Sequence, residues 1–399
     1  MSAAAMLRIH TTDELGLVKV VEAPSYAQID LSRVVQTWGE PSRAAAINCL
    51  SAEACSHIAV GRPGGVEVLQ SSSGAVEGFV AAAGVDDRTP SGVCLLPSVA
   101  DSLPSLLSCS RGGLMRLHAM SQEDGSSQCS FREELSWQSM ASVECMAVHA
   151  RDTATHIALA CNGSELGIWD LQKQQRSYHA KGNKPNRIGL VDKPWNTAAA
   201  FLPGSDGQKV VLGTAYHKLR LYDVKSRRPA LDIDFGEAKV TALAAQTNGM
   251  QVWAGSGMGK IECLDLRMNK LQGSLKGPGG AVKSLALHPE LPIIASVGLD
   301  RFLRIHNLDS KALLCKLYLK QHLTAVAWGS MQHEAAEAEE GAADTVGYTA
   351  ADVLKPHVLT DDAVEDAGRK RARPSSSKTA GSHKKGRSQR KKPKLPVQN

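Results

Sequence analysis

The chain has 399 residues, of which 43% are hydrophobic and only 4% aromatic, and it carries 46 Lys and Arg against 40 Asp and Glu. This length suits one large domain or two ordinary ones, and the nine cysteines, scattered without a Cys-x-x-Cys pair, argue against a secreted disulfide protein and a zinc finger. The first residues lack the apolar core of a signal peptide, and no stretch approaches the roughly 20 apolar residues of a membrane span, so we expect an intracellular soluble protein.

A short alternating apolar pattern recurs seven times along the chain. The copies are Val18–Glu22, Val66–Gln70, Met115–Ala119, Leu166–Leu171 with its Trp169-Asp170 pair, Leu219–Asp223, Ile261–Asp265 and Leu303–Asn307. They end near positions 22, 70, 119, 170, 223, 265 and 307, at intervals of 42 to 53 residues. Such a period is typical of a four-stranded propeller blade. The sequence therefore predicts an all-β, seven-bladed β-propeller.

The last repeat shows the order of strands within a blade. Ala281–His288 alternates apolar and polar residues, and Ile293–Val297 is a short β-branched run suited to a buried strand. A hairpin turn at Gly298–Arg301 leads to the recurring strand, which is third, and Leu313–Tyr318 follows as an outer fourth strand. A blade alone has open edges, so such units are stable only when they are stacked in a ring.

The two ends of the repeat region complement each other. His322–Trp328 has the pattern of another first strand, whereas the N-terminus offers Leu7–His10, Val18–Val21 and Ala27–Leu31 as second, third and fourth strands. We expect the C-terminal strand to complete the N-terminal blade and the propeller to occupy residues 1–330.

The connection between the fourth and fifth repeats, residues 181–195, is long, basic and ends in Trp195. Long loops on rigid scaffolds often carry function, although a solvated loop with Trp195 packed under the next strand fits equally well. The fifth repeat adds basic clusters in two turns at opposite ends of a strand, which cannot form one compact patch without help from neighbours. Such residues could contact RNA phosphates or be ordinary surface residues. The candidates for contacts with a partner or RNA are Lys181, Arg187, Lys193, Trp195, Tyr216, His217, Arg220, Arg227, Arg228 and Arg301.

No motif in the chain demands catalysis. Gly255–Lys260 lacks the Ser or Thr and the following helix of a phosphate-binding loop, so it is interpreted as a hairpin turn. Asp300 is expected to cap its own turn. No Ser-His-Asp, paired-carboxylate or His-cluster arrangement stands out. We predict that the protein is not an enzyme and has no catalytic, cofactor or metal site and no small-molecule substrate.

The repeat pattern ends at Ser330. Residues 331–368 form an acidic, Ala-rich linker that we expect to be disordered, and residues 369–399 contain twelve Lys and Arg and no acidic residue. Basic clusters of this kind are typical of nuclear or nucleolar targeting signals, a solubilising tail being the alternative. The residues assigned to targeting are Arg369, Lys370, Arg371, Arg373, Arg390, Lys391, Lys392 and Lys394.

The chain resembles the family of WD repeat-containing protein 74, best between Ser164 and Thr324. The basic C-terminal tail also fits this resemblance. The motifs that carry it are Leu166–Leu171, Pro194-Trp195, Phe201–Gly204, Tyr216-His217, Leu219–Asp223, Arg227–Pro229, Leu264–Arg267, Leu275–Gly277, Gly298–Arg301 and Leu303–His306.

The resemblance implies a WD-repeat propeller that acts as a nucleolar scaffold in the assembly of the large (60S) ribosomal subunit and in pre-rRNA processing. It implies association with proteins of pre-ribosomal particles, release by an AAA-type ATPase and a link to the RNA exosome machinery, and it leaves direct contact with pre-rRNA open. A different hypothesis is a substrate receptor of a nuclear ubiquitin ligase. Leu264–Arg267 partly matches the Trp-Asp-x-Arg motif of such receptors, whereas Trp169–Gln172 lacks the Arg.

Overall fold

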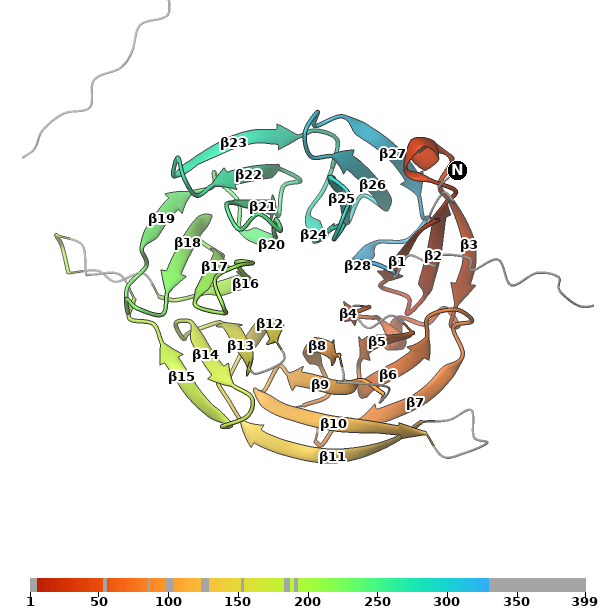
Figure 1. Cartoon of the computed structure of the whole chain (residues 1–399), viewed down its shortest axis with the longest axis horizontal. Helices are drawn as coiled ribbons and strands as arrows, with labels where there is room; N and C mark the ends of the chain where they lie inside the picture. The colour runs from red at the N-terminus through yellow and green to blue at the C-terminus, as the bar shows by residue number, and fades with distance from the viewer. Residues whose placement is uncertain are drawn as a thin grey trace, which may run out of the picture. The chain divides into compact units, whose positions relative to one another are not determined.

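The computed structural model describes residues 6–52, 56–84, 87–97, 103–122, 129–151, 154–182, 187–189 and 193–329, which all belong to one compact unit. Their strands form seven four-stranded antiparallel sheets around a central axis, which confirms the predicted seven-bladed β-propeller (Figure 1). The predicted acidic linker and basic tail lie outside the described residues. Within the described ranges, no helix is both long and apolar enough to cross a bilayer.

The first three blades are built mainly from residues before 140. From the innermost strand outward, blade 1 contains β28 (Leu323–Trp328), β1 (Leu7–Asp13), β2 (Val18–Ala23) and β3 (Arg33–Trp38). Blade 2 contains β4 (Cys49–Ser51), β5 (His57–Arg62), β6 (Gly65–Gln70) and β7 (Val76–Ala81). Blade 3 contains β8 (Pro90–Leu96), β9 (Ser105–Ser110), β10 (Leu114–Gln122) and β11 (Cys129–Gln138).

The remaining four blades follow the chain without interruption. Blade 4 contains β12 (Val143–Arg151), β13 (Ala154–Cys161), β14 (Gly167–Asp170) and β15 (Gln175–His179). Blade 5 contains β16 (Asn196–Phe201), β17 (Lys209–Thr214), β18 (Lys218–Asp223) and β19 (Leu231–Asp234). Blade 6 contains β20 (Val240–Ala245), β21 (Gln251–Ser256), β22 (Ile261–Asp265) and β23 (Lys270–Leu275). Blade 7 contains β24 (Val282–Leu287), β25 (Ile293–Gly298), β26 (Phe302–Asn307) and β27 (Leu313–Tyr318).

The seven copies of the sequence pattern all lie on third strands, namely β2, β6, β10, β14, β18, β22 and β26. These strands have neighbours on both sides within their sheet, and their alternating side chains pack against the adjacent blades. The recurring pattern therefore marks the same strand in every blade.

Apolar side chains fill the junctions between blades. The buried hydrophobic residues form seven clusters, and each cluster joins two neighbouring blades of the ring. At the junction of blades 5 and 6, for example, Val211 and Leu219 pack with Val240 and Val252. Burying one such side chain contributes about 1.5–3 kcal/mol, so the stability of each blade depends on its neighbours.

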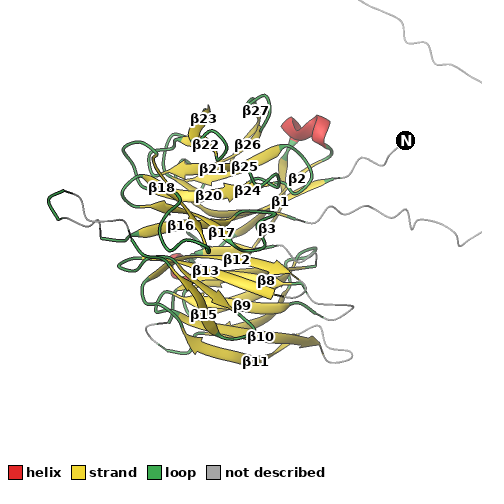
Figure 2. Ribbon diagram, turned by 60° about the vertical axis from the view of Figure 1, so that its left-hand side comes forward, coloured by secondary structure: helices red, strands yellow, loops and turns green. Residues whose placement is uncertain are grey.

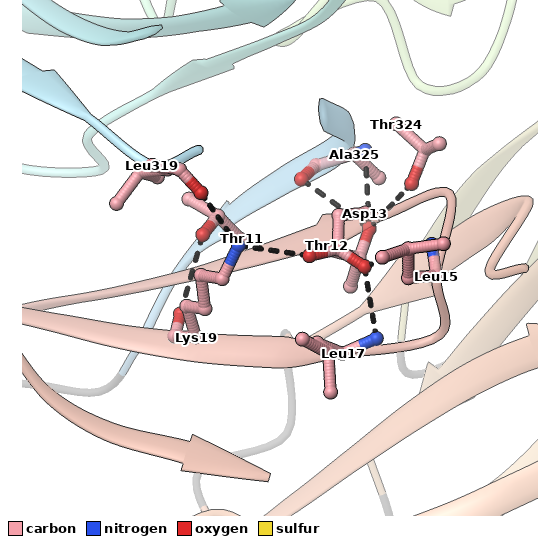
Figure 3. A network of polar contacts seen from close by, with 9 residues as sticks. All are labelled: Thr11, Thr12, Asp13, Leu15, Leu17, Lys19, Leu319, Thr324 and Ala325. Atoms are coloured by element: carbon pink, nitrogen blue, oxygen red, sulfur yellow. Dashed lines mark hydrogen bonds and ion pairs between the residues drawn. The ribbon is translucent and has the colours of Figure 1, made fainter. Parts of the chain in front are cut away.

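The ring closes where the last strand meets the first. β28 pairs with β1 in antiparallel register, with Ile9 opposite Trp328 and Thr12 opposite Ala325. The Thr12 hydroxyl lies 2.9 Å from that of Thr324 and accepts a 3.1 Å hydrogen bond from the Ala325 amide. Blade 1 thus combines strands from the two ends of the propeller (Figure 3).

A buried ion pair supports this seam. The Lys19 ammonium donates to Asp13 Oδ2 at 2.8 Å and to the Leu319 carbonyl at 2.7 Å (Figure 3). The other Asp13 oxygen accepts from the amides of Leu15 and Leu17, both at 3.0 Å. Asp13 has no exposed surface, so these three donors replace the water that its charge would otherwise require.

The fourth strand of blade 1 differs from the prediction. Ala27–Leu31, expected to be a strand, lies in a 3-10 helix, η1 (Tyr26–Leu31), and the fourth strand is β3 instead. Only Ile29 of this segment is buried, within the cluster that joins blade 7 to blade 1, while Leu31 is exposed. A single apolar anchor suits one helical turn better than a strand that would bury alternate residues. The turn lies beside β27 at the edge of the ring (Figure 2).

Two predicted turns are confirmed. Within the predicted Gly255–Lys260 turn, Gly255 and Ser256 end β21, and Gly257–Lys260 forms the hairpin turn to β22 with no helix after it. Asp300 caps its own turn by accepting from the Phe302 amide at 3.3 Å, and it also accepts from Gly279 and pairs with Arg304. A second short 3-10 helix, η2 (Arg43–Ala45), precedes blade 2.

Candidate interaction surface at blades 4 and 5

The long connection between blades 4 and 5 is fixed at its beginning. The Lys181 amide donates to the Arg227 carbonyl at 2.6 Å, and the Tyr178 hydroxyl donates to the Ser226 carbonyl at 2.7 Å. Both acceptors lie in the turn between β18 and β19. The first residues of the connection are therefore attached to the basic turn that contains Arg227 and Arg228.

The end of the connection is fixed at the opposite end of β18. The Trp195 carbonyl accepts from the Ala215 amide at 2.9 Å, in the turn between β17 and β18. The Pro194 carbonyl accepts from the Gly163 amide at 2.7 Å, in the equivalent turn of blade 4. The connection thus links the two basic turns of blade 5, which the sequence placed at opposite ends of one strand.

An aromatic pair marks this second end. The Trp195 and Tyr216 rings meet edge to face, with centroids 6.4 Å apart and planes at 84°. Trp195 is 39% exposed and Tyr216 43% exposed, so Trp195 is not packed under the next strand. Aromatic rings held on a rigid frame lose little conformational entropy when they bind a partner.

Most of the predicted cations surround this connection and are exposed. Lys181, Arg187 and Lys193 belong to the connection, and Arg227 and Arg228 belong to the turn after β18. His217 is half-buried, and its Nδ1 lies 3.7 Å from Asp234 Oδ1. Residues 183–186 and 190–192 of the connection lie outside the described residues.

Arg220 was wrongly assigned as a contact candidate. It is only 3% exposed, and its Nε donates to Asp232 Oδ2 at 3.2 Å. Burial disfavours its charge, but the neighbouring Tyr222 and two carboxylates hold the guanidinium pKa above its ordinary value. Arg220 lies in β18 directly opposite Asp232 of the outer strand β19, so its side chain is held within the blade and is not part of the surface.

The network beneath the surface joins blades 4 and 5. The Tyr222 hydroxyl donates to Glu165 Oε2 at 3.1 Å, and Glu165 lies in the turn between β13 and β14. Tyr222 is 1% exposed, and burial raises the pKa of its phenol strongly. A buried, satisfied hydrogen bond of this kind fixes the two blades relative to each other.

Exposed apolar residues continue around the same face of the ring. Tyr216, Met258 and Leu299 occupy the turns between second and third strands of blades 5, 6 and 7. Met258 is 72% exposed and Leu299 40% exposed. We call the surface formed by Trp195, Tyr216, Met258 and Leu299 the turn face.

The turn face also contains Arg301, in the same turn as Leu299, with a left-handed φ of 68°. Arg301 is exposed but belongs to blade 7, so the structure does not bring it next to the connection. Met258 and Leu299 were not predicted. A methionine and a leucine at hairpin tips, where Gly, Asn and Asp dominate, are the signal that could have found them.

No family model matches the chain. Curated relatives do match, and they confirm the predicted resemblance. The chain is 35% identical over 243 residues to WD repeat-containing protein 74 of Homo sapiens and 33% identical over 242 residues to the Mus musculus protein of that name, covering 59% of this chain and 61% of each relative. It is 38% identical over 182 residues to the Bos taurus protein of that name, covering 44% of this chain and 47% of the relative.

The chain therefore spans about three fifths of the length of the human and mouse relatives. These similarities support a WD-repeat scaffold and, in general terms, protein–protein interaction. WD-repeat propellers are generally non-enzymatic, and no catalytic family is indicated.

Proposed function

We propose that this protein is a non-enzymatic scaffold in the assembly of the large (60S) ribosomal subunit and in pre-rRNA processing. It docks on pre-ribosomal particles, binds proteins of those particles and is released by an AAA-type ATPase. The similarity to WD repeat-containing protein 74 supports this proposal, because it is the family whose resemblance implies that role.

The observation that carries the proposal is the connection that joins both basic turns of blade 5. Its two ends are held by backbone hydrogen bonds to opposite ends of β18, and exposed cations and two exposed aromatic rings lie along it. The aromatic rings suit a protein partner, and the cations suit an acidic protein segment or RNA phosphates. The exosome machinery is a further candidate partner.

In this proposal the basic tail directs the protein to the nucleolus. Arg369–Arg373 and Arg390–Lys394 act as nuclear and nucleolar targeting signals and add non-specific affinity for RNA. Deleting residues 369–399 from a fluorescent fusion should move the protein out of the nucleolus. If the truncated protein stays in the nucleolus, the tail is not the targeting signal.

The test of docking is charge reversal in the turn after β18. Arg227→Glu with Arg228→Glu should shift the tagged protein from pre-ribosomal fractions to free fractions on a sucrose gradient, while the circular dichroism spectrum of the purified variant stays that of the wild type. The matched control is Arg267→Glu with Lys270→Glu, which reverses two exposed charges around the equivalent turn of blade 6.

The control also tests the ligase-receptor hypothesis, because Arg267 belongs to the partial receptor motif. Its exposed side chain follows the turn cap at Asp265. If wild-type protein brings down a cullin adaptor and no large-subunit rRNA precursor, and the Arg267 variant loses the adaptor, the scaffold proposal is wrong. Unchanged sedimentation of the Arg227 and Arg228 variant would exclude that turn as the docking site.

A further inference from the structure

Three potential metal ligands meet at the junction of blades 2 and 3. His57 begins β5, Glu77 is the second residue of β7, and Cys129 begins β11. All three are buried, each less than a tenth exposed. His57 Nε2 lies 2.7 Å from Glu77 Oε2, Cys129 Sγ lies 3.6 Å from the same oxygen, and the ligand atoms of the three residues lie within 4.8 Å of one another.

The chain brings these residues together by a close approach of two outer strands. A Cβ atom on Gly78 would lie 2.2 Å from the Phe131 ring and 3.1 Å from the Cys129 carbonyl oxygen. A residue with a side chain at this position would push β11 away from β7. Gly78 therefore allows Cys129, from blade 3, to reach the carboxylate of Glu77, from blade 2.

The two ring nitrogens of His57 have different partners, and Nε2 is the one directed at Glu77. Its Nδ1 lies 2.6 Å from the Ser56 hydroxyl, which fixes the orientation of the ring. Its Nε2 lies 2.7 Å from Glu77 Oε2, so the ring N–H can donate to the carboxylate, and once that proton is released both atoms can ligate one metal ion. A partner on the far nitrogen is the usual arrangement of a metal-ligating histidine.

We propose that His57, Glu77 and Cys129 bind one Zn²⁺ ion, which joins blade 2 to blade 3. Imidazole, carboxylate and thiolate are all zinc ligands, and a water molecule would complete a tetrahedral site. This proposal departs from the predicted absence of a metal site, because the three residues are too far apart in the sequence to form a recognisable ligand motif.

The two distances to Glu77 Oε2 fit this geometry with a small adjustment. Zinc bonds of about 2.3 Å to sulfur and about 2.0 Å to oxygen place tetrahedral ligands about 3.5 Å apart, close to the 3.6 Å between Cys129 and Glu77. The His57 and Glu77 atoms would separate by about 0.6 Å, because two ligands at about 2.0 Å lie about 3.3 Å apart. Metal binding would form one bond to each ligand atom and release the thiol proton, and the proton shared by His57 and Glu77, to solvent.

The test is metal binding by the full chain, purified without a polyhistidine tag and stripped with a chelator. Zn²⁺ is titrated in competition with a chromophoric chelator, and Co²⁺ serves as a probe whose charge-transfer absorption reports a metal–thiolate bond. We expect one ion per chain. Cys129→Ser should weaken Zn²⁺ binding by at least about tenfold and abolish the Co²⁺–thiolate band.

The matched control is Cys263→Ser. Cys263 is another buried thiol, 3% exposed, on β22 in blade 6, and its substitution should leave both signals unchanged. Ser56→Ala should weaken binding by roughly tenfold, because the ring orientation is lost while all three ligands remain. If Cys129→Ser does not fold, Glu77→Gln should show the same loss, since the amide can still hydrogen-bond to His57.

Two results would overturn the inference. One is wild-type protein that binds Zn²⁺ no more tightly than Cys129→Ser does. The other is a Co²⁺–thiolate band that survives in Cys129→Ser, since the thiolate would then come from another cysteine. Neither result depends on the proposed role in ribosome assembly, because both measurements use the isolated protein.

Discussion

Blades 4 to 7 and blades 1 to 3 form the same fold with different contacts. In blades 4 to 7 the third strand ends in Asp or Asn, whose side chain accepts a hydrogen bond from the amide two residues later. The acceptors and their distances are Asp170 to Gln172 at 3.0 Å, Asp223 to Lys225 at 2.9 Å, Asp265 to Arg267 at 2.8 Å and Asn307 to Asp309 at 2.9 Å. This local turn chemistry makes these four repeats recognisable in the sequence.

Blades 1 to 3 depend more on contacts between distant segments. Lys19 bonds to the carbonyl of Leu319, and His57 and Glu77 meet Cys129 of the next blade. Gly74 lies against the Trp38 ring, where a Cβ atom would be 2.2 Å from the nearest ring atom. Because such contacts have no fixed sequence spacing, the first half of the chain gives a weaker repeat signal for an equally regular ring.

The largest effect that we predict concerns the seam. Lys19→Met should lower the free energy of unfolding by about 3–5 kcal/mol, because it leaves the Asp13 carboxylate buried without its cation. Urea unfolding followed by circular dichroism measures this change. Lys270→Met, at an exposed position in blade 6, should stay within about 0.5 kcal/mol of wild type. Equal effects of the two substitutions would contradict the contrast between the halves.

Acid should act on blade 1 before it acts on blade 4. His10 has no exposed surface, and burial, assisted by the charge of Arg8, lowers its pKa from 6.5 to about 3. Between the two pKa values His10 is protonated in the unfolded chain but not in the folded chain. The free energy of unfolding therefore falls as the pH falls, by up to about 1.4 kcal/mol per pH unit. His10→Phe should remove this part of the slope, measured by urea unfolding between pH 7 and pH 4.

Asp170 provides the comparison in blade 4. Burial tends to raise its pKa, but hydrogen bonds from the amide and side chain of Lys173 hold the pKa below 3.8. The ionised Asp170 side chain therefore contributes fully to the free energy of unfolding above pH 3.8. This contribution is lost only as the pH falls through the lower pKa of the folded state. Asp170→Asn should leave the slope above pH 5 unchanged. An altered slope in that range would mean that the acid response is not localised as we describe.

The turn caps should have a smaller effect. Asp265→Ala should cost about 1 kcal/mol, because two amides, those of Arg267 and Met268, lose their acceptor. Gln70→Ala, at the equivalent position of blade 2, should cost less than about 0.5 kcal/mol, since its exposed side chain accepts only from the Ser73 hydroxyl. Thermal unfolding of both variants checks the difference, and a larger loss in Gln70→Ala would contradict it.

The smallest stability effect is expected on the turn face. Met258→Ser should change the free energy of unfolding by less than about 0.5 kcal/mol, because its side chain is largely exposed. If the turn face binds a partner, the same variant should sediment less with pre-ribosomal particles. Full association of Met258→Ser together with Leu299→Ser would limit docking to the surface around blades 4 and 5.

The sequence by itself determined the number of blades, the position of the third strand in each and the turns at Gly257–Lys260 and Asp300. These features depend on the alternation of apolar and polar residues along a strand and on short polar side chains that bond to the backbone of their own turn. Both are local properties of the sequence. The sequence also showed that the connection before Trp195 was unusual, but it could not show that its two ends lie at opposite ends of β18.

Only the tertiary structure decided which side chains are buried together. Arg220 has the charge of a typical surface residue, yet it is buried and paired with Asp232 of the outer strand. Ala27–Leu31 alternates like a strand, yet only Ile29 has a cluster to pack against. His57 and Cys129 are 72 positions apart in the sequence, and they meet with Glu77 because two outer strands pass closely at Gly78. Strand alternation specifies a face, while the neighbour on that face is chosen by how the blades pack.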